Sequence, residues 1–336
     1  MGSRIKYLDL IKFFAIYFVI LGHSIQYIGA NPWQNIIWKF IYSFHVPLFM
    51  VVSGFFFSSS LKLSFGSFIK KKTIQLLLPS LCWYLILCLL NSALYSIINK
   101  ELTLKYDLHG LLNSFWFLKS LFFCYIITYL SIKLFRNELA ACIISCIAVC
   151  VIPFATYAAI NFLLPFFWIG FYLKKYIAWI DGKGNLLWKI SFVAFMLLFV
   201  FWNSKYTIYK SPIEILSYNP VSFSVGSFLI MLYRLFIGAV GSLLAIFSLR
   251  YLYHRFENNK ITDKLCEMGK HTLGIYLIQT VIFEVFFFAL SLSFDSLIVN
   301  LVSPFLSVLI LLICSMLANM IMKGRYSKLL LLGMQG

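Results

Sequence analysis

Ten runs of mostly apolar residues, each about 20 residues long, dominate this sequence. A run of that length crosses a bilayer as an α-helix, because a helix rises about 1.5 Å per residue and the hydrocarbon core is about 30 Å thick. The composition agrees, since 62% of the 336 residues are hydrophobic and only 12% are charged. We therefore predict an all-α, polytopic membrane protein that forms a single helical bundle and one domain over residues 1–336. Its ten helices are expected near 7–29, 36–59, 74–98, 113–134, 139–157, 159–178, 187–204, 223–249, 271–293 and 298–322.

The basic residues lie in short clusters between these spans, which indicates membrane topology rather than nucleic-acid binding despite a net charge of +17. Ten spans place both termini on one side, and the loops of that side carry 20 of the 28 Lys and Arg residues, against six on the other. Cytoplasmic loops are enriched in Lys and Arg, so both termini are predicted to be cytoplasmic. No Cys-x-x-Cys pair or Cys/His cluster has metal-ligand spacing, and no metal site is predicted.

The first span, YLDLIKFFAIYFVILGHS (7–24), carries Asp9, Lys12 and His23. At 100° per residue, Lys12 and His23 point within about 20° of each other, and Asp9 is a surface neighbour of Lys12. Such a polar stripe is expected to face the bundle interior or a wet cavity. Lys12, near the cytoplasmic end, suits an anionic ligand, and Asp9 would orient it. His23 lies roughly 16 Å farther along and suits proton transfer. In the alternative, Lys12 snorkels to the interface and His23 makes an ordinary helix–helix hydrogen bond.

The second span contains FHVPLFMVVSGFFF (44–57), with His45 in its outer half, at a depth similar to that of His23. The two histidines could flank one reaction centre. The alternative is a helix kinked at Pro47 with a histidine that only packs. Lys71 and Lys72 follow at the cytoplasmic face, where they could bind phosphate or merely obey the positive-inside rule.

Two further charges lie inside spans. Arg234 is near the middle of the eighth span, and Glu284 is in the outer part of the ninth. Because a charge facing lipid is costly, both are expected to face the interior, where they could pair with each other.

Several segments resemble, in order, the membrane-bound acyltransferase family 3, and most closely its branch of bacterial glycan O-acetyltransferases. They are DLIKFFAIYFVILGH, FHVPLFMVVSGFFF, SFIKKKTIQLLLPSLCWY, FWFLKSLFF (115–123), LPFFWIGFYLKKY (164–176) and MGKHTLGIYLIQT (268–280). The family's hallmark is a basic residue, ten residues, and then an essential histidine, and here Lys12 and His23 take those positions. The basic residue is usually Arg, and Lys lacks its bidentate geometry. A second departure is Gln279, where many relatives carry His.

The resemblance implies transfer of an acyl group, usually acetyl, from cytoplasmic acyl-CoA to a hydroxyl of a surface or lipid-linked glycan. It implies a multi-pass protein of the bacterial cytoplasmic membrane, in contact with membrane lipid. No bound cofactor is expected, since acetyl-CoA or another acyl-CoA is the donor substrate.

Roles for individual residues follow from the stripe and the resemblance together. His23 would act as general base on the acceptor hydroxyl, and His45 would orient the acceptor or share proton transfer. Lys12, with Lys71 and Lys72, would hold the CoA phosphates. The outer residues Trp116 and Phe117 would offer aromatic faces to a sugar ring or only anchor the helix at the interface. Ser53 would donate to the oxyanion.

Two other classes of protein fit a membrane bundle with internal charges. One is a transporter or lipid flippase, and the other is a non-catalytic subunit of a biosynthetic complex. The sequence leaves open the acceptor sugar, the acyl group, direct transfer against an acyl-enzyme, and the oligomeric state.

Overall fold

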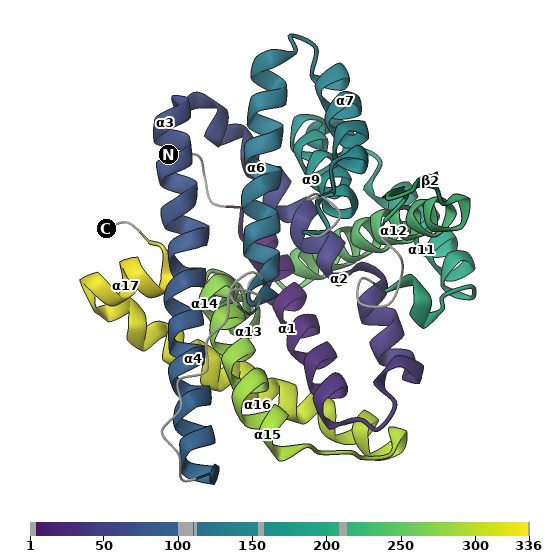
Figure 1. Ribbon diagram of the computed structural model, residues 1–336. Coiled ribbons are helices and arrows are strands. Elements are labelled where there is room, and N and C mark those ends of the chain that lie inside the picture. Colours follow the sequence, from purple (N-terminus) through teal and green to yellow (C-terminus); the bar gives the residue numbers. More distant parts are fainter. Residues whose placement is uncertain are drawn as a thin grey trace. The chain divides into compact units, whose positions relative to one another are not determined.

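A computed structural model describes residues 5–99, 110, 113–153, 158–207, 214–257 and 259–334, and the described chain is helical almost throughout (Figure 1). Within these residues, seven helices are long and apolar enough to cross a membrane. The prediction of an all-α, multi-pass membrane protein is therefore confirmed at this level. The number ten and the cytoplasmic position of both termini stay predictions.

A helix or a continuous group of helices lies over each of the ten predicted spans. The elements are α1 (Lys6–Ile28), η1 (Pro32–Gln34), α2 (Ile36–Phe55), η2 (Phe57–Lys62), α3 (Phe65–Lys72), η3 (Thr73–Leu77), α4 (Leu78–Asn99), α6 (Trp116–Leu134), α7 (Glu138–Val151), α9 (Ile160–Lys175), α10 (Ile177–Asp181), α11 (Gly184–Phe199), η4 (Ser204–Tyr206), β1 (Leu216–Tyr218), β2 (Val221–Phe223), α12 (Val225–Arg255), α13 (Lys260–Gly269), α14 (Thr272–Val281), η5 (Ile282–Phe287), α15 (Phe288–Leu290), α16 (Ser296–Lys323) and α17 (Arg325–Leu332).

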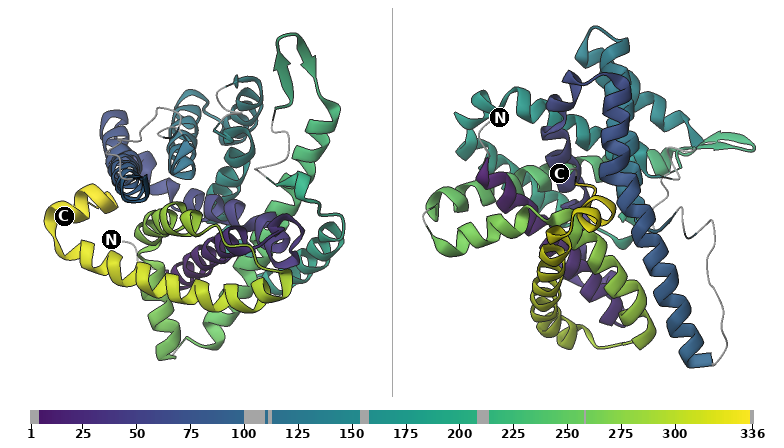
Figure 2. Two further views of the ribbon diagram at one scale, coloured as in Figure 1. Left: turned by 60° about the horizontal axis from the view of Figure 1, so that its bottom comes forward. Right: turned by 90° about the vertical axis from the view of Figure 1, so that its left-hand side faces the viewer.

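The helices over the fifth and seventh spans end earlier than predicted, whereas α12, over the eighth, continues to Arg255, past the predicted end at 249. Helix α7 ends at Val151, and residues 154–157 of the predicted span 139–157 lie outside the described part of the chain. Helix α11 has 16 residues and ends at Phe199, before the predicted end at 204. Both helices are apolar but shorter than a full bilayer crossing. Between α11 and α12, the antiparallel strands β1 and β2 form a short hairpin (Figure 2).

Residue contacts divide the chain into two compact units, each made of several segments. Unit 1 comprises Met1–Val19, Trp33–Ser64 and Phe123–Lys270, and unit 2 comprises Ile20–Pro32, Phe65–Phe122 and His271–Gly336. Helix α1 contributes its first part to unit 1 and its last part to unit 2. The prediction of one domain over the whole chain stays a prediction.

In unit 1, helices α2 and α9 cross with their backbones in contact. A Cβ atom added at Gly54 of α2 would lie 2.8 Å from the carbonyl carbon of Phe167 and closer still to its oxygen. A Cβ at Gly170 of α9 would meet the carbonyl of Val51 in the same way. Small residues allow such close approach between membrane helices, where tight packing replaces the hydrophobic effect. The crossing fixes the helix that carries His45 and Ser53.

In unit 2, the last turns of α1 are held by polar contacts from the C-terminal part of the chain. Ser24 Oγ lies 2.9 Å from Ser307 Oγ of α16. Farther on, the backbone N–H of Phe294 donates to the carbonyl of Ile28 at 2.8 Å, and the N–H of Ala30 donates to the carbonyl of Phe294 at 3.0 Å. These contacts follow His23 by one to seven residues and hold the end of α1 in place.

Candidate active site

His23 of α1 makes a hydrogen bond to a glutamine that lies 256 residues away in sequence. Its Nδ1 is 2.9 Å from Oε1 of Gln279 on α14, and the Gln279 residue is 0% exposed. Gln279 Nε2 donates to the carbonyl oxygen of Tyr276 at 3.1 Å and to Thr280 Oγ1 at 2.9 Å. The Thr280 hydroxyl gives its own hydrogen to the same Tyr276 carbonyl at 2.8 Å. The network therefore determines which end of the amide is oxygen.

This network also assigns the tautomer of His23. An amide oxygen can only accept, so Nδ1 of the imidazole must carry the hydrogen. In the neutral ring the lone pair then lies on Nε2. Within the described part of the chain, the hydrogen bond of the His23 ring is the one that Nδ1 makes to Gln279. Nε2 is therefore the ring nitrogen that can accept a proton.

Aromatic rings surround His23 and extend to the predicted acceptor residues. The ring of Phe283 is 5.6 Å from that of His23, edge to face, and Tyr27 stacks on Phe283 at 5.3 Å. The Tyr276 ring lies 6.1 Å from Phe117, whose other neighbour, Trp116, is also 6.1 Å away. Unit 2 therefore brings Trp116 and Phe117 close to the residue whose carbonyl holds Gln279.

The other end of the stripe lies in unit 1. Lys12 Nζ donates to Asp9 Oδ1 at 2.9 Å, and the Asp9 side chain is only 8% exposed, against 24% for Lys12. The Lys12 ammonium also lies 5.0 Å from the ring centroid of Phe56. Gly269 of α13 packs directly against the backbone carbonyl of Asp9. Lys12 is thus oriented from two sides and still partly accessible.

A second cation beside the Phe55–Phe56 pair was missed by sequence reasoning. Lys174, at the end of α9, lies 4.9 Å from the ring centroid of Phe55, and the Phe55 and Phe56 centroids are 5.5 Å apart. A signal was present, because the LPFFWIGFYLKKY segment ends in a pair of lysines. The predicted cations Lys71 and Lys72 belong instead to α3 of unit 2, where Lys71 is exposed and Lys72 is buried.

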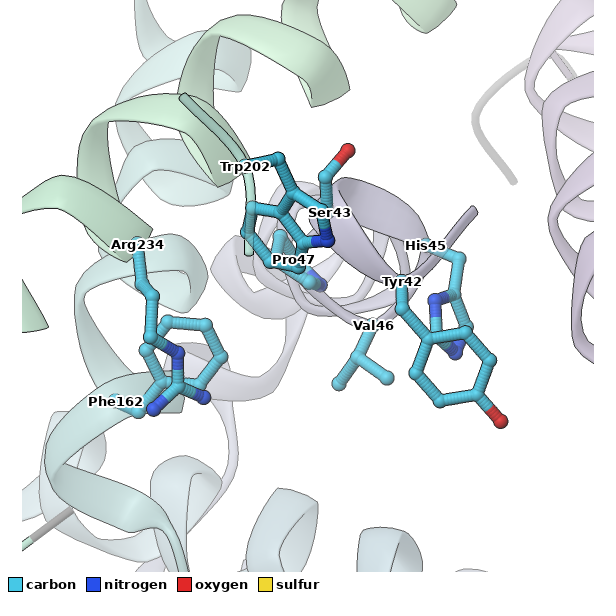
Figure 3. A pocket seen from close by; sticks show the side chains of 8 residues that line it. All are labelled: Tyr42, Ser43, His45, Val46, Pro47, Phe162, Trp202 and Arg234. Carbon is cyan, nitrogen blue, oxygen red and sulfur yellow. The ribbon is translucent and has the colours of Figure 1, made fainter. Parts of the chain in front are cut away.

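His45 lines a small niche in unit 1, together with Tyr42, Ser43, Phe162, Trp202 and Arg234 (Figure 3). His45 Nδ1 lies 2.8 Å from the Ile41 carbonyl, which can only accept, so its neutral ring also has the lone pair on Nε2. Arg234 is 3% exposed, and its guanidinium lies 4.1 Å from the ring centroid of Phe162. In Figure 3, Arg234 and His45 lie on opposite sides of the niche.

The niche is too small for a sugar. The space open to the centre of a water molecule is about 10 Å³, which is room for about one water. Pro47 has no N–H to donate to the Ser43 carbonyl, as an ordinary helical residue would. This carbonyl therefore keeps its capacity to accept a hydrogen bond where Ser43 and Pro47 line the niche. The niche is therefore a buried polar cluster rather than a cleft for a glycan.

The remaining predicted residues are distributed between the units. The Ser53 carbonyl accepts a hydrogen bond from the Tyr125 hydroxyl at 3.3 Å in unit 1. Glu284 is partly buried in the π-helix η5 of unit 2, whereas Arg234 belongs to unit 1. The Arg234–Glu284 pair and a centre shared by His23 and His45 stay predictions. Within the described ranges, no three His, Cys, Asp or Glu side chains are grouped as metal ligands.

These features define a class: a membrane-embedded helical protein with an oriented imidazole and, nearer the N-terminal end of the same helix, a lysine held by an aspartate. The model of the acyltransferase-3 family, described as an acyltransferase domain, matches residues 5–323. The chain belongs to this family, which confirms the resemblance drawn from its motifs, and it is a multi-pass membrane protein of acyltransferase type.

Two relatives of this chain share one name. The chain is similar to the nodulation protein NolL of Mesorhizobium japonicum, with 26% identity over 298 residues, covering 82% of this chain and 76% of the relative. It is also similar to the nodulation protein NolL of Sinorhizobium fredii, with 26% identity over 295 residues, covering 82% of this chain and 77% of the relative. No solved structure matches the chain.

Proposed function

We propose that this chain is an O-acyltransferase of the bacterial cytoplasmic membrane, with ten helices and both termini in the cytoplasm. It moves an acetyl or similar acyl group from cytoplasmic acyl-CoA to a hydroxyl of a surface or lipid-linked glycan. The observation that carries the proposal is the His23–Gln279 hydrogen bond, which leaves Nε2 of a partly buried imidazole with its lone pair available.

In the proposed reaction, His23 Nε2 takes the proton of the acceptor hydroxyl as the oxygen attacks the thioester carbonyl. The carbon–oxygen double bond opens to a tetrahedral oxyanion. Its collapse breaks the carbon–sulfur bond, leaves the acyl group on the acceptor oxygen, and releases CoA thiolate. The thiolate takes the proton from the imidazolium, which restores the base. A transient acyl-enzyme is an alternative route to the same products.

The donor is proposed to lie along α1. Lys12 and Lys174 would pair with its phosphates, because both ammonium groups lie against the neighbouring rings of Phe55 and Phe56. Lys71 and Lys72 would add positive charge from α3. Lys12 and His23 are separated by roughly 16 Å of helix, a distance that an extended pantetheine arm can span.

The acceptor is proposed to enter beside the aromatic residues of unit 2. Trp116 and Phe117 offer ring faces suited to a sugar, and Phe117 contacts Tyr276 next to the His23 network. His45 and Ser53 are proposed to assist the acceptor and the oxyanion, respectively. The niche at His45 would take a single polar group, such as one hydroxyl, rather than a ring.

The first test is transfer of radiolabelled acetyl from acetyl-CoA into the lipid and polysaccharide fractions of membranes. Wild type and His23→Ala are compared at matched expression, with His254→Ala as control, because His254 is an exposed histidine at the end of α12. Label is expected in the wild type and the control and should be lost with His23→Ala. Equal label with His23→Ala would refute the base. If no label enters in any membrane, succinyl-CoA is tried as donor before transport is tested.

The donor site has a test of its own. Lys12→Ala should raise the KM for acetyl-CoA, while Lys62→Ala, an exposed lysine, should leave it unchanged. With S-acetylpantetheine, which lacks the nucleotide phosphates, Lys12→Ala and wild type should react with the same KM. An equal increase in KM for both donors would show that Lys12 does not recognise phosphate.

A further inference from the structure

We propose that Gln279 is a positioning residue, whose buried amide holds His23 in the tautomer that has its lone pair on Nε2. The inference rests on the proposed function and deepens it, because it explains what makes His23 a base.

The amide of Gln279 has one favourable orientation. Reversing it would aim Oε1 at the Tyr276 carbonyl and forfeit the two hydrogen bonds from Nε2. It would also aim the Nε2 hydrogens at His23 Nδ1 and convert the ring to the other tautomer. Gln279 is fully buried, so water does not replace the lost hydrogen bonds. Each polar group left without a partner would therefore cost its full desolvation penalty.

The same contact serves both protonation states of the base. The neutral ring donates from Nδ1 to Oε1 and accepts a proton at Nε2. Once protonated, the imidazolium still donates from Nδ1 to Oε1, so no group has to move. Pre-organisation of this kind lowers the reorganisation needed during proton transfer. A histidine at position 279 would itself have two tautomers, whereas the glutamine network specifies one.

Thr280 allows a second, independent test of how the Gln279 amide is oriented. Its hydroxyl donates to the Tyr276 carbonyl and accepts from Gln279 Nε2. Thr280 therefore helps to hold the Gln279 amide with its nitrogen toward Tyr276 and its oxygen toward His23. Thr280→Val keeps the shape of the side chain and removes one of the two bonds that hold the amide. We expect it to weaken the orientation of Gln279, and hence of His23, to a smaller degree than loss of Gln279 itself.

The kinetic experiment uses the full-length protein in membranes and acetyl-CoA as donor. Gln279→Met keeps an unbranched side chain of similar length but removes the strong acceptor. We expect kcat to fall about 10-fold or more, because part of the general-base contribution is lost, while the KM for acetyl-CoA stays within about 2-fold. Thr280→Val should fall between Gln279→Met and wild type. Gln34→Met makes the same chemical change at an exposed glutamine and should leave both constants unchanged.

A spectroscopic experiment tests the tautomer without any turnover. The detergent-purified protein carries ¹⁵N-labelled histidine, and the His23 signals are those missing from His23→Ala. At alkaline pH, wild-type His23 should show a protonated Nδ1 and an unprotonated Nε2. In Gln279→Met the signals should move toward the Nε2–H form. Equal thermal unfolding of the variants shows that they are folded.

The outcomes separate this inference from the proposed function. A wild-type His23 with the hydrogen on Nε2, or Gln279→Met with unchanged kcat, would overturn the positioning role even if His23→Ala abolishes transfer. Conversely, the expected tautomer together with full activity of His23→Ala would leave the hydrogen bond in place and refute the base itself.

Discussion

Replacing Gly54 with alanine is expected to force helices α2 and α9 apart. The new Cβ would lie 2.8 Å from the carbonyl carbon of Phe167, whereas ordinary contact begins at 3.4 Å. The local separation must therefore grow by more than about 0.6 Å, because the carbonyl oxygen of Phe167 would lie closer still. The obstacle is backbone, which cannot rotate aside as a flexible side chain can. Gly170 meets the carbonyl of Val51 in the same crossing, so the two positions share one constraint.

The size of the effect follows from two opposing terms. Overpacking of a tight interface costs about 1–3 kcal/mol, and a gap of 0.5–1 Å forfeits about a quarter to a half of each dispersion contact along the crossing. Alanine returns about 1 kcal/mol through its higher helix propensity. We therefore expect Gly54→Ala to lower the stability by about 1–2 kcal/mol in total.

The measurement is thermal unfolding of purified protein in detergent at a fixed scan rate. The matched control is Gly226→Ala in the first turn of α12, where an added Cβ meets nothing within 4 Å, so no loss is expected. The double variant Gly54→Ala/Gly170→Ala should lose less than the sum of the two single losses, because the first methyl group already opens the crossing. Wild-type stability of Gly54→Ala, or full additivity of the two losses, would refute the close crossing.

Three other predictions concern the helix packed against Asp9, a hydrogen bond from Trp83, and the aromatic ring of Phe117. Gly269→Ala should raise the KM for acetyl-CoA several-fold, because its Cβ would lie 2.7 Å from the carbonyl carbon of Asp9, and donor kinetics check this. Trp83→Phe should cost about 1 kcal/mol in thermal unfolding, since it removes the 2.9 Å hydrogen bond to the Leu331 carbonyl. Phe117→Leu should raise the KM for the acceptor and leave that for acetyl-CoA unchanged, as measured with each substrate varied in turn.

Each of these three predictions can be contradicted by a specific result. An unchanged donor KM in Gly269→Ala would mean that α13 yields without moving Asp9. If Trp83→Phe unfolds at the wild-type temperature, the hydrogen bond of Trp83 to the Leu331 carbonyl contributes no net stability. A change in the donor constant in Phe117→Leu would place this ring on the donor path.

The positions of the helices were largely predictable because hydropathy and length are local properties. The first span, predicted at 7–29, is the helix Lys6–Ile28, and the last, predicted at 298–322, is Ser296–Lys323. Packing was not predictable in this way. That Gly54 meets the backbone of Phe167 depends on a partner more than a hundred residues away, and no periodicity within one helix contains that information.

The same distinction between local and long-range contacts holds for the candidate site. Asp9 and Lys12 are three residues apart on one helix, so their contact follows from helix geometry alone. The contact between His23 and Gln279 joins helices from opposite ends of the sequence. From sequence, Gln279 was only a departure from the family pattern, and its meaning depends on Thr280 and the Tyr276 carbonyl beside it. Lys174 was overlooked because lysines at the end of a span usually only mark topology.

Helix geometry explains why the basic residue and the histidine are separated by ten residues. Eleven steps of 100° amount to three full turns plus about 20°, so Lys12 and His23 share a face. One residue more or fewer would rotate His23 by about 100° relative to Lys12. Within α1, the spacing alone therefore sets the angle between the two side chains, whatever partner each of them has.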